Sequence, residues 1–396
     1  MTKAERRQPI PAEIWVLVAA AFLIALGFGI VAPILPQFAA SFDVGVMAAS
    51  AIVSVFAFVR LIFAPAGGAL IGTFGERRIY LWGLSIVGLS SALSGLAPDY
   101  WTLLLFRGLG GIGSVMFTVS SMGLLVRLSP PAQRGHTASL YGSAFLLGNI
   151  FGPILGSALA GLGLRVPFFL YAGAVFASVL VVMVFLRRDT GGPDLAGHAQ
   201  PKMTLGEAMA LPYYRALLVT GFAHGWSNFG VRIALLPLMA ASVPTIGAAA
   251  AGIALTLFAV GNAVTQQATG RLIDRMGRRP FLVIGLGLSA LVTLPFGWFD
   301  TIGWFLALST LAGAGAAFIA PASQALLADL IGSNRNGGQA LSTFSMATDL
   351  GSITGTLLAG AIADLLGFGW AWAVTAFVLA SAVVPWLLVK RPRAAR

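Results

Sequence analysis

The sequence predicts an all-α membrane protein with twelve transmembrane helices arranged in two six-helix bundles. Three observations predict this fold. The 396-residue chain is 58% hydrophobic and only 9% charged, with a mean hydropathy of +0.90, whereas a soluble domain carries roughly a quarter charged residues. The apolar residues form long uninterrupted runs. Similar motifs also recur at half the chain length, which indicates two related halves.

Twelve apolar runs are long enough to cross a bilayer, which takes about 20 helical residues. They span residues 14–38, 47–71, 79–98, 101–126, 136–160, 166–186, 214–241, 248–270, 280–299, 303–330, 339–363 and 368–389. The runs are continuously apolar rather than alternating, which favours helices over a β-barrel. The first run is too long for a cleaved signal peptide, so we expect it to remain as the first helix.

The longest polar segment, residues 187–213, separates two sets of six spans and is rich in glycine and proline. Such a composition is typical of a linker. We therefore expect an N-terminal bundle over residues 1–186, a cytoplasmic linker over residues 187–213 and a C-terminal bundle over residues 214–396.

The basic residues are distributed unevenly along this pattern. Of the 24 lysines and arginines, 20 lie at the termini, or in or beside the loops that follow even-numbered spans. This asymmetry predicts that both termini are cytoplasmic, in a multi-pass protein of the cytoplasmic (inner) membrane. The net charge of +11 is therefore a membrane-surface charge, and we expect no nucleic-acid partner. The opposite loops carry Asp43, Asp99, Asp300 and Asp364.

The chain has no cysteine, and its three histidines show no metal-ligand spacing. We therefore expect no metal site and no cofactor. There is also no nucleophile elbow and no nucleotide-binding loop, so the sequence predicts neither an enzyme nor a primary pump.

One charged segment, Gly270-Arg-Leu-Ile-Asp-Arg-Met-Gly-Arg-Arg279, has a weaker copy at residues 68–77. The framing glycines of the two copies are displaced by 202 residues, and two further matched segments are displaced by 201 and 202 residues. Each copy is expected to form a tight glycine-framed turn between two spans, because glycine adopts the backbone conformations that such turns need. Parallel six-helix repeats place a substrate site near the middle of the membrane, between the halves.

On these segments the chain resembles the major facilitator superfamily over essentially its whole length. That family carries a Gly-x-Leu-Ala-Asp-Arg-x-Gly-Arg-Arg-like turn between helices 2 and 3, often echoed between helices 8 and 9. The resemblance implies a gating turn that latches the two halves in the outward-open state, formed by Gly270, Asp274, Arg275, Gly277 and Arg278 and, in the first copy, by Gly68, Gly75 and Arg77. The first copy has Gly72 and Thr73 where Asp and Arg are expected, so we expect the C-terminal latch to dominate.

Two more motifs resemble signatures of this family. Residues 107–114, Arg-Gly-Leu-Gly-Gly-Ile-Gly-Ser, are similar to the Arg-x-x-Gln-Gly-x-Gly motif of proton-coupled members, with Gly110 in place of Gln. The resemblance implies that Arg107 assists proton transfer or holds an anionic group. The alternative is a structural charge near the outer interface.

The other motif lies in the fifth span and resembles the Gly-x-x-x-Gly-Pro-x-x-Gly-Gly signature of the antiporter branch. It comprises Gly148, Gly152, Pro153 and Gly156, with Ser157 at the last position. The resemblance favours export over import. Small residues at this spacing also permit close helix packing.

Polar residues inside the spans identify a candidate site, because ionisable groups are rare in lipid and usually functional. His224, Asn228 and Arg232 follow one another at intervals of four, which predicts one helical face. Asp349 is the only acid deep inside a span, so it is the first candidate for a proton carrier, and His224 is the second. The alternative for Asp349 is a permanent ion pair with Arg232 or Arg60.

The substrate-binding residues are expected to be Arg60, Trp226, Asn228, Arg232, Asn262, Gln266, Gln324 and Ser345. Trp226 has packing as its alternative role. Three span arginines against one acid predict a positive cavity, which suits a small amphiphilic substrate that is neutral, zwitterionic or anionic rather than a simple cation.

The sequence thus predicts a secondary active transporter, a proton-coupled exporter of the multidrug-efflux type that works by alternating access. Its partners would be a small-molecule substrate, protons and the lipid bilayer, and we expect a monomer. A flippase for a lipid or lipid-linked molecule and a proton-coupled importer are the alternatives within transport. Outside transport, the alternative is a membrane receptor or scaffold.

Overall fold

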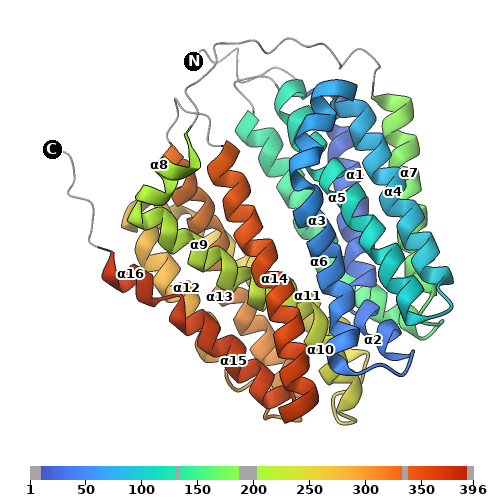
Figure 1. Cartoon of the computed structure of the whole chain (residues 1–396), viewed down its shortest axis with the longest axis vertical. Helices are drawn as coiled ribbons and strands as arrows, with labels where there is room; N and C mark the ends of the chain where they lie inside the picture. Colours follow the sequence, from blue (N-terminus) through green and yellow to red (C-terminus); the bar gives the residue numbers. More distant parts are fainter. Residues whose placement is uncertain (1–9, 130–133, 187–202, 332–337, 390–396) are drawn as a thin grey trace. The chain divides into compact units, whose positions relative to one another are not determined.

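A computed structural model of the chain describes residues 10–129, 134–186, 203–331 and 338–389. These residues are helical apart from short connections (Figure 1). The first half contains α1 (Ala12–Val31), α2 (Leu35–Ala40), α3 (Val46–Phe74), α4 (Glu76–Leu96), α5 (Tyr100–Leu128), α6 (Arg134–Ala160) and α7 (Val166–Phe185). The second half contains α8 (Leu205–Ala210), α9 (Pro212–His224), η3 (Gly225–Val231), α10 (Arg232–Ser242), α11 (Ala250–Met276), α12 (Arg278–Thr293), α13 (Ile302–Ile331), α14 (Gly338–Leu366), α15 (Phe368–Ser381) and α16 (Val384–Leu388).

Each predicted span corresponds to one helix or to consecutive helices. Within the described residues, nine helical segments are long and apolar enough to cross a membrane. The seventh predicted span is not counted as one helix, because it consists of three consecutive helices: α9, the π-helix η3 and α10. The ninth corresponds to α12, which has only 16 residues. The all-helical membrane fold predicted from the sequence is confirmed.

The predicted glycine-framed turns are shorter than the sequence suggested. Gly68 lies inside α3 and Gly270 lies inside α11, so neither glycine frames a turn. The chain instead turns at Gly75 (φ 79°) and at Gly277 (φ 85°), each a single residue between two helices. We refer to these as the Gly75 turn and the Gly277 turn. The prediction failed because the helices continue beyond the apolar runs, and hydropathy does not detect this continuation.

The backbone carries further signs of the internal repeat. In the described residues, positive φ occurs at Asp43, Gly75, Gly163, Gly247, Gly277 and Gly367. These six positions form three pairs, displaced by 204 (247 − 43), 202 (277 − 75) and 204 (367 − 163) residues. Only glycine adopts this conformation without steric penalty. The two halves therefore share turn geometry at three equivalent positions.

The chain divides into two compact units. Each unit corresponds to one half of the sequence, except that it also contains one short segment from the other half. The first unit comprises Met1–Val44, Val55–Leu195 and Ala251–Thr256, and the second comprises Gly45–Ser54, Ala196–Ala250 and Leu257–Arg396. The described part of the predicted linker, residues 203–213, begins the second half with α8 and the first residues of α9. A capping box at Thr204 and Glu207 starts α8.

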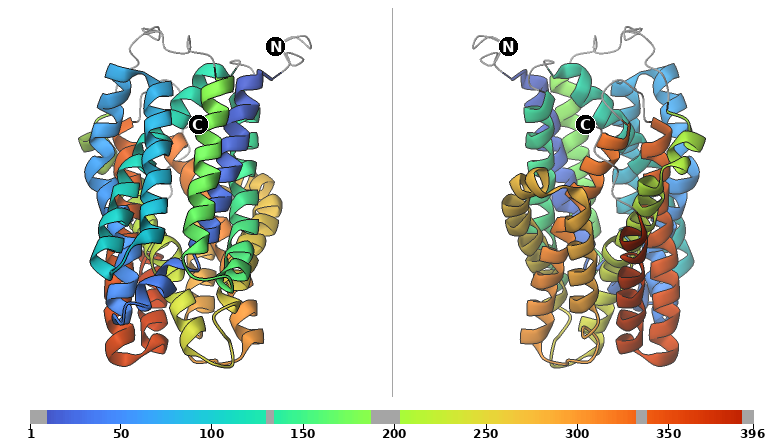
Figure 2. Two further views of the ribbon diagram at one scale, coloured as in Figure 1. Left: turned by 90° about the vertical axis from the view of Figure 1, so that its right-hand side faces the viewer. Right: turned by 90° about the vertical axis from the view of Figure 1, so that its left-hand side faces the viewer.

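In the first unit, α1 packs against both α6 and α7 (Figures 1 and 2). Glycines make the α1–α6 approach possible. A Cβ atom on Gly152 would lie 2.6 Å from the Cα of Gly29, and one on Gly156 would lie 2.1 Å from the carbonyl oxygen of Ile30. In the same unit, the Gly252 N–H of α11 donates to Ser157 Oγ (2.9 Å), and Thr256 Oγ1 donates to the Ile150 carbonyl (3.0 Å).

The second unit contains an equivalent of the Thr256 contact, made by the N-terminal part of α3. Ser54 Oγ donates to the Ile353 carbonyl of α14 at 3.3 Å. Asp364, near the end of α14, accepts hydrogen bonds from the Val46 and Met47 N–H groups at 2.8 and 2.7 Å. Ser54 and Thr256 are displaced by 202 residues (256 − 54), so equivalent hydroxyl groups bind helix carbonyls in both units.

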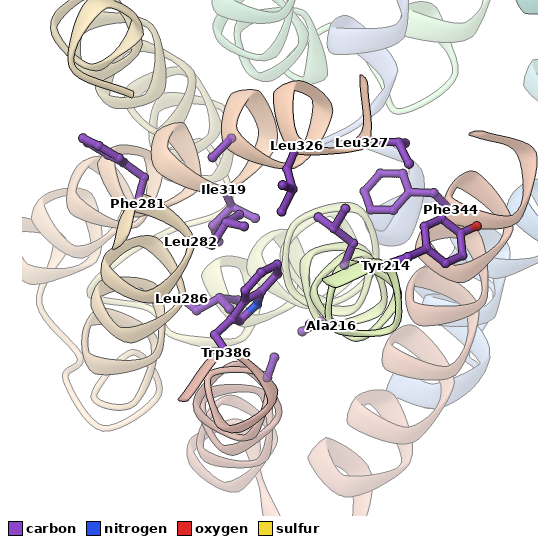
Figure 3. Close-up of a cluster of buried hydrophobic side chains, with 14 of the residues drawn as sticks. Tyr214, Ala216, Phe281, Leu282, Leu286, Ile319, Leu326, Leu327, Phe344 and Trp386 are labelled. Atoms are coloured by element: carbon purple, nitrogen blue, oxygen red, sulfur yellow. The ribbon is translucent and has the colours of Figure 1, made fainter. Parts of the chain in front are cut away.

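The apolar core of the second unit lies among α9, α12, α13, α14 and α16 (Figure 3). Figure 3 shows Trp386 beside Leu286 and Leu282. The indole of Trp386 is fully buried, and its Nε1 donates to Thr220 Oγ1 of α9 at 2.8 Å. A buried indole needs such a partner, so this bond attaches the short helix α16 to the core.

Candidate functional site

The residues predicted to form the site in the seventh span lie around a wide turn of the helix. The N–H of Arg232 binds the carbonyl of Ser227, five residues earlier, and residues 225–231 form the π-helix η3. Within one helical span, π turns are rare and often mark functional sites. Asn228 Nδ2 and His224 Nδ1 lie 3.0 Å apart, and both side chains are half-buried. The prediction that His224 and Asn228 share a face is confirmed.

Arg232 does not share the partial exposure of that face. Its side chain is only 1% exposed, and its guanidinium carbon lies 4.6 Å from the ring centroid of Phe258, 5.5 Å from that of Phe296 and 5.8 Å from that of Trp372. Neither Nε nor Nη1 has a hydrogen-bond partner. A π turn holds more residues than an α turn, so the residues after it are rotated about the helix axis. Regular spacing at intervals of four therefore predicted the wrong face for Arg232, whose side chain lies in the aromatic interior of the second unit.

The contacts that the structure gives for Arg232 are with aromatic rings, and the alternative of a permanent ion pair for Asp349 stays a prediction. Asp349 is half-buried on α14. Its helix packs very closely against α9 and η3. A Cβ atom on Gly225 would lie 1.9 Å from the Thr348 carbonyl oxygen, and one on Gly351 would lie 2.0 Å from the Phe222 carbonyl oxygen. Asp349 thus lies on the stretch of α14 that meets the start of η3.

Trp226 packs within the second unit. Its side chain is 5% exposed, its Nε1 donates to Thr375 Oγ1 at 3.3 Å, and Gly355 of α14 leaves room for its indole. These contacts agree with the packing alternative for Trp226. The remaining predicted residues of this unit differ in exposure: Asn262 and Gln266 on α11 are half-buried, whereas Gln324 on α13 and Ser345 on α14 are exposed.

Two of the predicted arginines lie in the first unit. Arg60 of α3 is half-buried, and its Nη1 donates to Ser114 Oγ at 3.0 Å. Arg107 of α5 is 4% exposed, and its guanidinium carbon lies 4.7 Å from the ring centroid of Phe56. The glycine-rich motif that follows Arg107 lets α5 approach α3, because a Cβ on Gly111 would lie 2.7 Å from the Phe56 carbonyl oxygen.

The antiporter-like motif serves close packing in this structure. Gly148, Gly152 and Gly156 all face α1, and a Cβ atom on Gly148 would lie 2.6 Å from the Ala25 Cβ. Pro153 lies inside α6. The small-residue packing predicted from the spacing is therefore confirmed.

The basic residues of the two turns bind partners within their own units. Arg77 donates from Nε to the Leu186 carbonyl (2.9 Å) and from Nη2 to the Met183 carbonyl (3.0 Å) at the end of α7. Arg278 pairs with Asp329 of α13, with Nε and Oδ2 3.3 Å apart. Asp274 and Arg275 belong to α11, and their side chains lie outside what the structure describes.

Sequence reasoning missed the partners of these turns. Glu76 forms an ion pair with Arg127, and Arg278 forms one with Asp329. Both residues of the second pair lie 202 positions after those of the first (278 − 76 and 329 − 127). The repeat displacement, already visible in the sequence, was a signal that could have found both pairs. No comparable signal in the sequence indicated that Asp364 caps the N-terminus of α3.

Comparisons with known proteins agree with this architecture. A sequence model described as Major Facilitator Superfamily matches residues 17–229 and 217–396. Tetracycline resistance protein, class G, of Vibrio anguillarum is 28% identical over 369 residues, which cover 89% of this chain and 92% of that protein. Multidrug resistance protein MdtG of Salmonella paratyphi C is 26% identical over 399 residues, which cover 94% of each chain.

A crystal structure of a POT family transporter in complex with 5-aminolevulinic acid has the same fold, with a TM-score of 0.79, 13% identity and coverage of 96% of each chain. The family model covers most of the sequence, and the relatives are transporters rather than enzymes. The chain therefore belongs to the Major Facilitator Superfamily and is a multi-pass secondary transporter similar to its drug/proton antiporter branch.

Proposed function

We propose that the protein exports a small amphiphilic compound, neutral, zwitterionic or anionic, in exchange for protons by alternating access. The charge balance inside the spans carries this proposal. Arg60 binds a serine hydroxyl, while Arg107 and Arg232 contact aromatic rings. The spans thus hold three arginines against one acid placed deep inside them, Asp349. An interior with an excess of positive charge repels a simple lipophilic cation and attracts an anionic group.

Proton coupling requires a group that titrates within the spans. Asp349 is our first candidate because it is a half-buried acid on a helix that packs against a π turn. His224 is the second candidate, since it directly precedes that turn and contacts Asn228. Both lie in the second unit, so we assign the coupling mainly to the C-terminal half.

Export as the direction of transport is supported by two independent features. The Gly148–Gly156 motif resembles the antiporter signature, and the two relatives reported above are named for drug resistance. The positive-inside distribution supports cytoplasmic termini. We propose that the transporter acts as a monomer.

The decisive experiment uses purified protein in proteoliposomes with an imposed pH gradient. The transported probe is chosen from a matched set of benzoate, benzamide and benzamidine, together with tetracycline. We expect Asp349→Asn to abolish proton-driven accumulation of the probe while retaining exchange of probe across the membrane without a gradient. Asp43→Asn, a change of an acid outside the spans, is the matched control and keeps full coupling.

Two outcomes would contradict the proposal. Full proton-driven transport by Asp349→Asn would remove Asp349 as the proton carrier. Preferential transport of benzamidine over benzoate and benzamide would show that the substrate is cationic and that the arginines do not select against cations.

A further inference from the structure

We propose that the aromatic cluster around Arg232 binds a halide ion such as chloride. The cluster, which we call the Arg232 site, comprises Arg232 at the start of α10, Phe258 of α11, Phe296 after α12 and Trp372 of α15. All four residues belong to the second unit. Two buried side chains of this site carry N–H groups that call for an acceptor.

Arg232 is buried with part of its hydrogen-bonding capacity unused. Its side chain is 1% exposed, and neither Nε nor Nη1 has a hydrogen-bond partner among the described residues. The guanidinium carbon lies 4.6, 5.5 and 5.8 Å from the centroids of three aromatic rings. Ring faces stabilise a cation but accept N–H groups only weakly. A buried charge without hydrogen bonds is costly, so the site favours an acceptor that carries negative charge.

Trp372 supplies a second unused donor in the same site. Its indole is fully buried, and its Nε1 has no hydrogen-bond partner in the described part of the chain. The indole lies 4.7 Å from the Phe296 ring, centroid to centroid. Two other buried indoles of this unit, those of Trp226 and Trp386, donate to threonine hydroxyls. Trp372 differs from them by lying beside Arg232, where an anion would accept both kinds of N–H group.

The donor-only character of these groups selects an anion over water. Arginine and tryptophan side chains donate hydrogen bonds and cannot accept them. A water molecule would leave its own hydrogens in need of acceptors, whereas a halide only accepts and also neutralises the guanidinium. Aromatic faces repel anions, so we place the ion at the N–H groups rather than over the rings. The side chains of Arg232 and Trp372 are 1% and 0% exposed, which favours a monatomic ion over an organic carboxylate.

A halide at Arg232 is compatible with the proposed substrate preference. It offsets one of the three positive charges in the spans, and Arg60 and Arg107 still outnumber Asp349. The ion then belongs to the folded second unit rather than to the transported cargo, whatever the substrate and the direction of transport.

The test uses the full-length protein in detergent micelles and needs neither substrate nor proton gradient, so its result is independent of the proposed transport activity. The midpoint of thermal unfolding is measured in sodium gluconate, chloride, bromide and benzoate at one ionic strength. Arg232→Met removes the cation, and Trp372→Phe removes the indole N–H while it keeps an aromatic ring. Arg165→Gln is the matched control, because Arg165 also lies over a phenylalanine ring but donates to the Gly95 and Ala97 carbonyls.

We expect the wild-type midpoint to rise as chloride or bromide replaces gluconate, as it does for a ligand that binds the folded state. Benzoate should give the same midpoint as gluconate. Arg165→Gln should keep the rise, Trp372→Phe should weaken it and Arg232→Met should lose it. In gluconate, Arg232→Met should unfold at the wild-type temperature or above it, and this difference should narrow as halide is added.

Wild-type crystals soaked in bromide give a direct check that remains available if a variant fails to fold. We expect an anomalous-scattering peak beside the Arg232 guanidinium. The absence of that peak, equal wild-type midpoints in halide and gluconate, or an equal rise in Arg232→Met would overturn the proposal. A rise in benzoate that requires Arg232 would also overturn it, because the arginine would then bind an organic carboxylate.

Discussion

Asp364, near the end of α14, caps the N-terminus of α3 by accepting the Val46 N–H at 2.8 Å, and its second oxygen accepts the Met47 N–H at 2.7 Å. A helix N-terminus leaves N–H groups without partners, and a carboxylate satisfies them while it also favours the helix dipole. Residues more than 300 positions apart in sequence are joined by these two bonds.

We expect Asp364→Ala to lower the free energy of unfolding of the second unit by about 1 kcal/mol, the usual effect of losing an N-cap. Thermal unfolding followed by tryptophan fluorescence measures the change. Asp300→Ala is the matched control, since Asp300 is an exposed acid in another short connection and only its backbone carbonyl takes part in a recorded bond. Equal effects of the two variants would mean that the cap contributes nothing.

The cap of α5 predicts a dependence on pH. Asp99 accepts hydrogen bonds from the N–H and the Oγ1 of Thr102 at 2.9 and 2.8 Å, and these bonds lower the pKa of the Asp99 carboxyl below its ordinary value. A carboxyl with a lowered folded-state pKa stabilises the fold above its unfolded pKa of about 3.9. That contribution disappears as the pH falls through the folded-state pKa.

Wild type should therefore unfold at a higher temperature than Asp99→Ala near pH 7, and the difference should shrink as the pH approaches 3. Unfolding midpoints of the two proteins across this range test the prediction. A difference that stays constant with pH would show that the ionised carboxylate is not what stabilises the helix start.

Close packing between η3 and α14 makes a strong prediction about Gly225. A Cβ there would lie 1.9 Å from the Thr348 carbonyl oxygen, so Gly225→Ala must separate the helices, at a cost of roughly 1–3 kcal/mol. Gly287→Ala in α12 is the control, because a Cβ at Gly287 meets nothing within 4 Å. It should be neutral or stabilising by up to about 1 kcal/mol. Comparable unfolding midpoints for the two variants would contradict the close contact.

The buried guanidinium of Arg232 predicts that replacing it impairs transport without lowering the stability of the fold. Contact with aromatic faces stabilises a buried cation by about 0.5–2 kcal/mol, whereas moving an ion out of water costs several kcal/mol. Arg232→Met should therefore unfold at or above the wild-type temperature, while transport of the proteoliposome probe falls. Arg165→Met should instead be destabilised, because Arg165 donates to the Gly95 and Ala97 carbonyls. A markedly less stable Arg232→Met would show that the arginine serves the fold.

Hydropathy located the spans well because lipid requires long apolar helices. It misplaced the turns, since α3 and α11 remain helical beyond the apolar runs, up to Phe74 and Met276. It also missed η3, in which Gly225 and Gly230 lie close against α14, because no periodic pattern marks a π turn. The burial of Arg232 follows that turn, and for this reason regular helical spacing could not predict it.

The pairs of left-handed residues also show that one backbone turn can be formed by different residue types. Gly75 and Gly277 match in residue type, whereas Asp43 corresponds to Gly247. Backbone angles therefore identify a repeated turn even where the aligned residues differ. Among the described residues outside glycine, Asp43 is the one that adopts this conformation, which glycine tolerates best, so Asp43→Gly should keep the shape of its turn.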